Sequence, residues 1–217
     1  EIAARNVKSE TPAAKGKLTA SGPDLPALIK IASQLLGDGK QDSKLLSKQL
    51  NDAPKAFDIK TDFDADLKAG FVDIPNLSIK ALGMVTTAKL NAKQVSSDTP
   101  SLSGELKANG PDLPLLMQIA GAFQAKDSAL PVLAQDLGKI KDKKFNIDTR
   151  FNVDMKSGKI DLPSLAANAL GFNLSGNLKG DNIQKSSGNM GGQFMITSKE
   201  PKPLLRAMGQ ADLAEVL

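Results

Sequence analysis

The feature that most constrains the fold of this chain is a repeat with a constant spacing of 88 residues. The segment Phe57–Phe63 (FDIKTDF) is followed 88 residues later by Phe145–Phe151 (FNIDTRF). At the same spacing, Leu18–Pro26 (LTASGPDLP) precedes Leu106–Pro114 (LKANGPDLP). The 217 residues therefore hold about two and a half copies of one unit, and stacked units share their cores with their neighbours.

The repeat divides the chain into three consecutive parts of one continuous repeat domain. We expect residues 1–56 to be the C-terminal part of a preceding copy with its helices, and residues 57–144 to be a complete copy of sheet and helix. Residues 145–217 then form a second, nearly complete copy. Because the sequence opens inside a copy, we expect it to be a fragment of a longer protein.

The residues that follow Phe57 alternate between apolar and polar side chains, which is the period of a strand with one dry and one wet face. The alternation runs over Phe57–Ala69 and again over Phe145–Ser157, so each predicted strand has thirteen residues. That length corresponds to roughly 43 Å at about 3.3 Å per residue. One-sided strands are typical of antiparallel sheets, and strands this long favour a strongly twisted, curved sheet.

Turns and further strands complete each copy. Gly70 and Gly158 are predicted turns, and Phe71–Leu82 is a second strand in which the apolar phase changes at Pro75. A phase change at proline indicates a β-bulge or an edge position. Gly83 is the next predicted turn. Two more strands are expected over residues 84–92 and 102–108, with copies over residues 172–180 and 190–196.

Each copy is expected to end in short helices. Asp112 and the earlier Asp24 stand where a side chain caps a helix, and Pro114 and Pro26 suit the first helical turn. A second helix is expected near residues 42–50 and again near residues 131–138. The predicted fold is therefore α+β: a mainly antiparallel, groove-like sheet of repeats of about 88 residues, with short helices at the end of each repeat. The apolar stripe of the helix comprises Leu113, Leu116, Met117, Ala120 and Phe123.

The residue types argue against an enzyme. The chain has no His, Cys or Tyr, so most general bases, nucleophiles and soft-metal ligands are missing, and no cofactor is expected. Asp58, Asp62, Asp64 and Asp66 raise the question of calcium, but their spacing is that of one strand face and lacks the loop pattern of a calcium site. We interpret these carboxylates as a solvated strand face and expect no metal site.

The charge distribution argues against nucleic acid as a partner. The chain carries 28 basic and 24 acidic residues, and the excess is spread along the sequence without an arginine-rich run. There is no run of about 18 apolar residues, so no membrane-spanning helix is predicted within these residues.

The apolar face of the predicted sheet allows two interpretations. The helices can close it as an ordinary core, or part of it can stay open as a groove for a ligand or partner. Small residues such as Ala88, Gly104, Gly176 and Gly192 are expected to leave volume beside larger ones. The residues predicted to line a groove are Phe57, Ile59, Phe63, Leu67, Leu90, Leu102, Leu106, Phe145, Ile147, Phe151, Val153, Met155, Leu174, Leu178 and Phe194.

Two repeated signatures resemble the AsmA family of bacterial envelope proteins. The first is G-x-L-x-A-x-G-P-D-L-P-x-L over Gly16–Leu28 and Gly104–Leu116. The second is D-I/L-P-x-L, followed by A-L-G, over Asp73–Gly83 and Asp161–Gly171. The similarity extends over essentially the whole chain, although the signatures carry no reaction chemistry.

The resemblance implies more than the periodicity does. It implies an elongated, groove-like β-structure in the periplasm of Gram-negative bacteria, anchored in the inner membrane by an N-terminal helix that this sequence lacks. It also implies a part in phospholipid movement and outer-membrane biogenesis, with no catalytic residues. The expected partners are phospholipid or another acyl-chain lipid, the membrane and other envelope proteins. The alternative is a periplasmic scaffold module with a closed core, whose exposed sheet edges bind other proteins.

Overall fold

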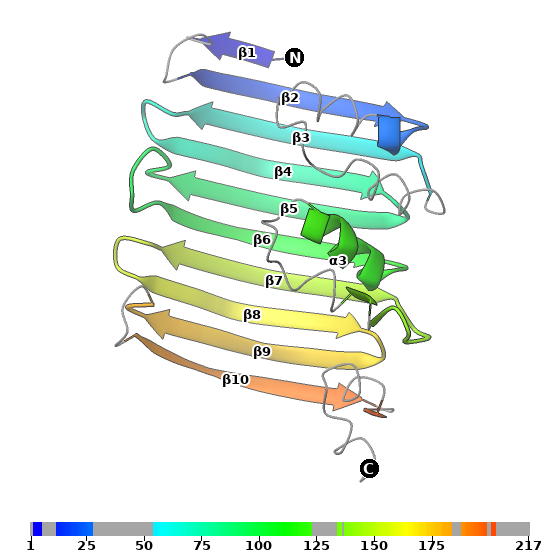
Figure 1. The fold of residues 1–217 in the computed structure, drawn as a ribbon. Helices are drawn as coiled ribbons and strands as arrows, with labels where there is room; N and C mark the ends of the chain where they lie inside the picture. The colour runs from blue at the N-terminus through cyan, green and yellow to red at the C-terminus, as the bar shows by residue number, and fades with distance from the viewer. Residues whose placement is uncertain are drawn as a thin grey trace.

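In the computed structural model the chain forms an open antiparallel sheet of ten strands, in which spatial order follows sequence order (Figure 1). The structure describes residues 2–5, 12–27, 54–122, 134–135, 137–183, 188–198 and 201–202. The predicted antiparallel sheet is confirmed. The strands are β1 (Ile2–Arg5), β2 (Ala13–Gly22), β3 (Phe57–Asp66), β4 (Phe71–Ala81), β5 (Met84–Lys93), β6 (Ser101–Gly110), β7 (Phe145–Asp154), β8 (Lys159–Ala169), β9 (Phe172–Asp181) and β10 (Asn189–Ser198).

The strand boundaries follow the spacing found in the sequence. Strands β3, β4, β5 and β6 each begin 88 residues before β7, β8, β9 and β10, respectively, and each pair has the same length. Strand β2 likewise begins 88 residues before β6. The same alternation of side chains therefore returns on every fourth strand.

The predicted strand length of thirteen residues is wrong. Strands β3 and β7 have ten residues each, and both end at an aspartate. The Asp66 carboxylate accepts the N–H of Ala69 at 2.8 Å, and the Leu67 N–H donates to the carbonyl of Pro12 at 3.2 Å. An aspartate that binds the backbone three residues later starts a turn, so the chain leaves the sheet although the alternation continues.

The predicted turns and the irregularity at Pro75 are confirmed. The pairing of β4 with β5 shifts register between Ile74 and Leu77, on either side of Pro75. A bulge accommodates the missing N–H of proline and explains the change of phase. Gly70 and Gly158 have φ of 73° and 64°, the left-handed conformation that glycine adopts without a steric cost.

Two-residue loops connect β4 to β5 and β8 to β9, and each begins with a leucine in the left-handed region. Leu82 and Gly83 have φ of 57° and 73°, and Leu170 and Gly171 have φ of 56° and 80°. Positive φ at both positions defines the hairpin turn that matches strand twist. Both leucines are buried, at 6% and 7% exposure, so packing offsets the strained backbone.

The two turn glycines differ in their surroundings, and this leads to a first prediction. A Cβ on Gly171 would meet nothing within 4 Å, whereas a Cβ on Gly83 would lie 3.2 Å from Cγ of Pro111. We expect Gly171→Ala to cost about 1–2 kcal/mol of unfolding free energy through the backbone alone. Gly83→Ala should cost more, and urea denaturation measures both. An equal or smaller loss for Gly83→Ala would contradict the described turn packing.

The helix α3 (Leu113–Ala122) belongs to the connection from β6 to β7 and lies near one end of the strands (Figure 1). The predicted caps are confirmed, because the Leu115 N–H donates to Asp112 Oδ1 at 2.8 Å and the Ala27 N–H donates to Asp24 Oδ1 at 3.0 Å. Phe123 of the predicted stripe lies outside the described residues. Capping therefore sets where the helical segments begin.

A small core lies at this end of the sheet. Leu137, Ile140 and Leu170 form a buried cluster, and Leu113 and Met117 of α3 pack against it. In the predicted helix near 131–138, residues 134, 135 and 137 are helical, while the one near 42–50 falls outside the described residues. The helical segments thus close one end of the sheet.

Candidate functional site

The pairing register gathers the apolar side chains of successive strands on one side of the sheet. Thr61 is paired with Leu77, Leu77 with Ala88, and Ala88 with Leu106, so these residues form a row across four strands. Paired residues project to the same side of a sheet, and alternate residues along a strand share that side. We call this side, as β2 to β10 form it, the apolar face. Its members are Ala14, Gly16, Leu18 and Ala20; Phe57, Ile59, Thr61, Phe63 and Ala65; Val72, Ile74, Leu77 and Ile79; Met84, Thr86, Ala88, Leu90 and Ala92; Leu102, Gly104, Leu106 and Ala108; Phe145, Ile147, Thr149, Phe151 and Val153; Ile160, Leu162, Leu165, Ala167 and Ala169; Phe172, Leu174, Gly176, Leu178 and Gly180; and Met190, Gly192, Phe194 and Ile196.

Phenylalanine rings fill the space beside the glycines of this face. A Cβ on Gly104 would lie 3.0 Å from Cζ of Phe151, and one on Gly176 would lie 2.6 Å from Cδ1 of Phe194. The expectation that these glycines leave open volume is therefore wrong: the ring of a neighbouring strand occupies it. Aromatic rings that cover glycines of the next strand fix the register of a sheet.

The side chains of the apolar face are mostly half-buried. Ala88, Ala108 and Phe145 are buried, and Phe145 is only 4% exposed, at the end where the small core lies. Leu18 and Leu102 are 43% and 41% exposed. The described residues therefore cover this face at one end and leave part of it accessible elsewhere.

The structure brings nearly all of the predicted lining residues together. All except Leu67 and Met155 lie on strands and on the apolar face. Leu67 and Met155 come directly after the ends of β3 and β7, in turns. Phe145 is the predicted lining residue that the chain itself buries, so it belongs to the core at that end.

Sequence reasoning missed the contribution of β4 and β8 to this face. Leu77, Ile79, Ile160, Leu162 and Leu165 all lie on it. The phase change at the proline hid them, because alternation alone does not say which half of an interrupted strand faces which side. The signal in the sequence was the presence of hydrophobic residues at every second position, both before and after the proline of each strand.

The opposite side of the sheet carries the charges, and many are paired across strands. Lys15 Nζ lies 2.6 Å from Asp64 Oδ2, and this hydrogen bond raises the pKa of Lys15. Lys17 lies close to Asp62 on the neighbouring strand, and Lys60 lies close to Asp58 on its own strand. Asp58, Asp62 and Asp64 therefore lie beside lysines of the sheet, and Asp66 accepts the N–H of Ala69 in the turn. Such exposed pairs contribute little to stability, but their charges keep this face hydrated.

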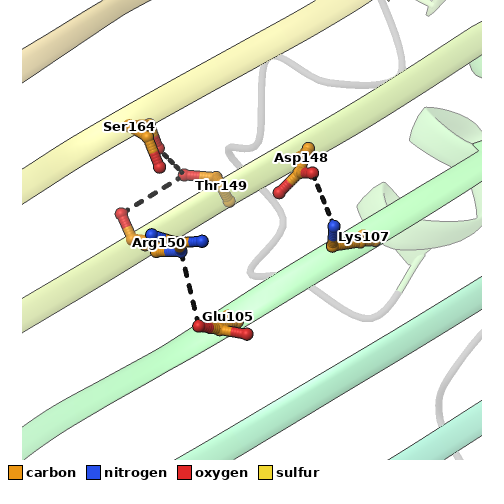
Figure 2. A network of polar contacts seen from close by, with 6 residues as sticks. All are labelled: Glu105, Lys107, Asp148, Thr149, Arg150 and Ser164. Atoms are coloured by element: carbon orange, nitrogen blue, oxygen red, sulfur yellow. Dashed lines mark hydrogen bonds and ion pairs between the residues drawn. The ribbon is translucent and has the colours of Figure 1, made fainter.

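Figure 2 shows the same arrangement between β6, β7 and β8. Lys107 Nζ lies 2.9 Å from Asp148 Oδ2, and Arg150 Nε lies 3.3 Å from Glu105 Oε1. Thr149, which belongs to the apolar face, instead donates its hydroxyl to the backbone carbonyl of Ser164 at 3.1 Å. The two sides of the sheet thus differ sharply in polarity.

A hollow of about 390 Å³ lies mainly among residues of the charged side. Lys60, Asp62, Lys89, Glu105 and Lys107 contribute to its lining. Both signs of charge are present, so the hollow does not select an anion or a cation. Among the described residues, no group of three or more carboxylates could hold a metal ion.

The turn after β7 provides a second prediction. The Ser157 hydroxyl donates to Asp154 Oδ2 at 2.8 Å, and the N–H groups of Ser157 and Lys156 donate to Asp154 Oδ1. The Ser157 hydroxyl, followed by these backbone donors, lowers the pKa of Asp154. We expect Ser157→Ala to raise this pKa toward its ordinary value, measured by NMR titration of the carboxyl carbon.

The sign of the pH dependence follows from the lowered pKa. The stabilising contribution of Asp154 is present above its unfolded-state pKa and is lost as pH falls through the folded-state pKa. Ser157→Ala should reduce that loss, whereas Ser175→Ala on β9 serves as a distant control. An unchanged Asp154 titration in Ser157→Ala would contradict the assigned cause.

Comparisons with protein-family models, with curated proteins and with solved structures found no match for the chain. Across the part of the chain that the structure describes, no helix combines the length and the apolar character needed to cross a membrane.

Proposed function

We propose that this chain is a non-enzymatic part of a lipid-binding β-structure whose apolar face holds phospholipid acyl chains. The observation that carries the proposal is the set of half-exposed apolar rows that runs across β2 to β10. The resemblance to the AsmA family supports the same reading. On that resemblance we propose a location in the periplasm of Gram-negative bacteria, an anchor in the inner membrane and a role in moving phospholipid for outer-membrane biogenesis.

The free energy of acyl burial is large enough for this function. Each buried methylene contributes about 0.8 kcal/mol, so a chain of about sixteen carbons costs on the order of 10 kcal/mol to expose to water. Phe63, Leu90, Leu106 and Phe151 offer an apolar surface that removes much of this cost. The head group stays in water at the margin of the face, where the charged side chains begin.

The repeated strand pattern supports movement as well as binding. Leu90 and Leu178 occupy equivalent positions 88 residues apart, as do Phe63 and Phe151. Strands are spaced about 4.8 Å apart, so ten of them extend the sheet for about 43 Å. Similar surroundings at successive positions let an acyl chain pass along the face without a deep free-energy minimum. Curvature of this repeated sheet into a groove is part of the proposal.

A second candidate function is a scaffold module with a closed apolar face. The buried cluster of Leu137, Ile140 and Leu170, together with buried Phe145, favours it, because the chain covers its own apolar surface at that end. A scaffold would use the sheet edges to bind other envelope proteins. It predicts a stable protein with no affinity for acyl chains.

A binding titration with a fluorescent fatty acid distinguishes these functions and is a third prediction. We expect saturable binding to the unaltered chain and an increase in Kd of about tenfold in Leu102→Glu, because an acyl chain would bury the new charge. Leu102 is 41% exposed, so the substitution is compatible with folding.

Asn152→Glu is the matched control for this titration. Asn152 is exposed and paired with Ser103, the neighbour of Leu102, so it faces the charged side. Its Kd should remain within about twofold of the unaltered chain, a difference of about 0.4 kcal/mol. Absence of binding by the unaltered chain, or equal weakening by both substitutions, would favour the scaffold.

A further inference from the structure

Strand β10 is the last strand of the sheet and presents an unusually apolar surface. It pairs with β9 on one side, and the described residues place no strand on its other side. Met190, Phe194 and Ile196 of its apolar face are 65%, 52% and 66% exposed. An unpaired strand edge with exposed apolar side chains is a template for pairing with another chain segment.

The two strands equivalent to β10 show what kind of strand pairs with such a strand on its other side. Strands β2 and β6 precede β10 by 176 and 88 residues, and each is paired antiparallel with a following strand. Gly16 of β2 is opposite Phe63, and Gly104 of β6 is opposite Phe151. The third glycine of this series is Gly192. It therefore marks a place for a phenylalanine ring on the next strand.

The surroundings of Gly192 agree with a missing ring. A Cβ on Gly104 would meet β5 on one side and the Phe151 ring on the other. The three atoms nearest to a Cβ on Gly192 all belong to the backbone of Asn177 and Leu178, both on β9. On the β9 side, Gly192 is as crowded as Gly104 is on its β5 side, but no ring stands among the three nearest atoms as Phe151 does at Gly104.

The charged side of β10 imposes no ionic requirement on an incoming strand. Lys17 of β2 and Glu105 of β6 have oppositely charged partners on the following strand. Gln193 stands at the equivalent position of β10. Recognition would therefore depend on backbone pairing and on the apolar face.

We infer that the free edge of β10 is a binding site for one antiparallel strand of another polypeptide segment, of the β7 type, with a phenylalanine opposite Gly192. The register of β6 with β7, carried forward by 88 residues, would place the equivalents of Phe151, Thr149 and Ile147 opposite Gly192, Phe194 and Ile196, respectively. At the C-terminal end of β10, Ser198 stands where β2 and β6 have Gly22 and Gly110. The equivalent of Phe145 in the incoming strand therefore has no glycine opposite it.

A synthetic peptide with the sequence of residues 145–154 tests this site on the intact chain. We expect saturable binding in fluorescence anisotropy, with slowed hydrogen exchange confined to the β10 amides. A Phe151→Ala peptide should bind at least tenfold more weakly, whereas a Phe145→Ala peptide should stay within twofold. The difference between two phenylalanines of one peptide separates the glycine site from general hydrophobic binding.

The inference would be overturned by equal weakening with both alanine peptides, by protection of amides away from β10, or by no binding. Protection of β10 that rises with protein concentration without peptide would assign the edge to a second copy of the chain, which also contradicts it. The inference is independent of acyl binding, because the fatty-acid titration probes the sheet surface and the peptide probes the strand edge.

Discussion

Phe145→Ala is expected to lower the free energy of unfolding by about 3–4 kcal/mol, which is the usual loss when a buried phenylalanine is truncated. The ring is 4% exposed and lies over Gly110, with Cε1 2.8 Å from the place of a Cβ on that glycine. Truncation leaves a cavity that the extended backbone of β6 and β7 cannot close. Urea or thermal unfolding monitored by circular dichroism measures the loss.

Phe194→Ala is the matched control for this prediction. The Phe194 ring also lies over a glycine, Gly176, but it is 52% exposed on the last strand of the sheet. Folding removes less apolar area of Phe194 from water than of Phe145, so truncation of Phe194 should cost about 1 kcal/mol. Similar losses for Phe145→Ala and Phe194→Ala would show that the end of the sheet near α3 is not a core.

Gly104→Val is expected to destabilise the sheet by about 3 kcal/mol, the upper part of the usual range for overpacking. A Cβ there would meet the carbonyl oxygen of Lys89 and lie 3.0 Å from both Leu90 Cδ2 and Phe151 Cζ. The carbonyl belongs to the backbone and cannot move without disturbing the pairing of β5 with β6. The Phe151 ring would also lose its place over the glycine.

Gly191→Val provides the comparison for Gly104→Val. A Cβ on Gly191 would meet nothing within 4 Å, although Gly191 also lies within a strand. Valine has a higher strand propensity than glycine, so this substitution should be neutral or slightly stabilising. A loss at Gly104 no larger than at Gly191 would contradict the described packing of rings over glycines.

Local patterns predicted much of the fold. Alternation placed the strands, the glycine at position 70 placed a turn, the proline at position 75 placed a bulge, and Asp112 placed the start of a helix. Each of these depends on side chains that lie close together in sequence. The error in strand length has a local cause as well, because Asp66 and Asp154 bind the following backbone and end their strands before the alternation stops.

The packing of the candidate site was less predictable because it depends on register between strands. Composition suggested that Gly104 and Gly176 leave space, but the pairing places Phe151 opposite Gly104 and Phe194 opposite Gly176. The Phe145 ring likewise shares the space over Gly110 with Met84, which comes from a strand two positions away. No pattern within one strand shows such contacts.

The most direct test of an acyl-binding apolar face is paramagnetic broadening of methyl NMR signals by a spin-labelled fatty acid. We expect broadening at Ile59, Leu90 and Leu106, with Val85 and Ala166 of the charged side unaffected. Equal broadening on both sides of the sheet, or none on the apolar face at saturating fatty acid, would contradict it.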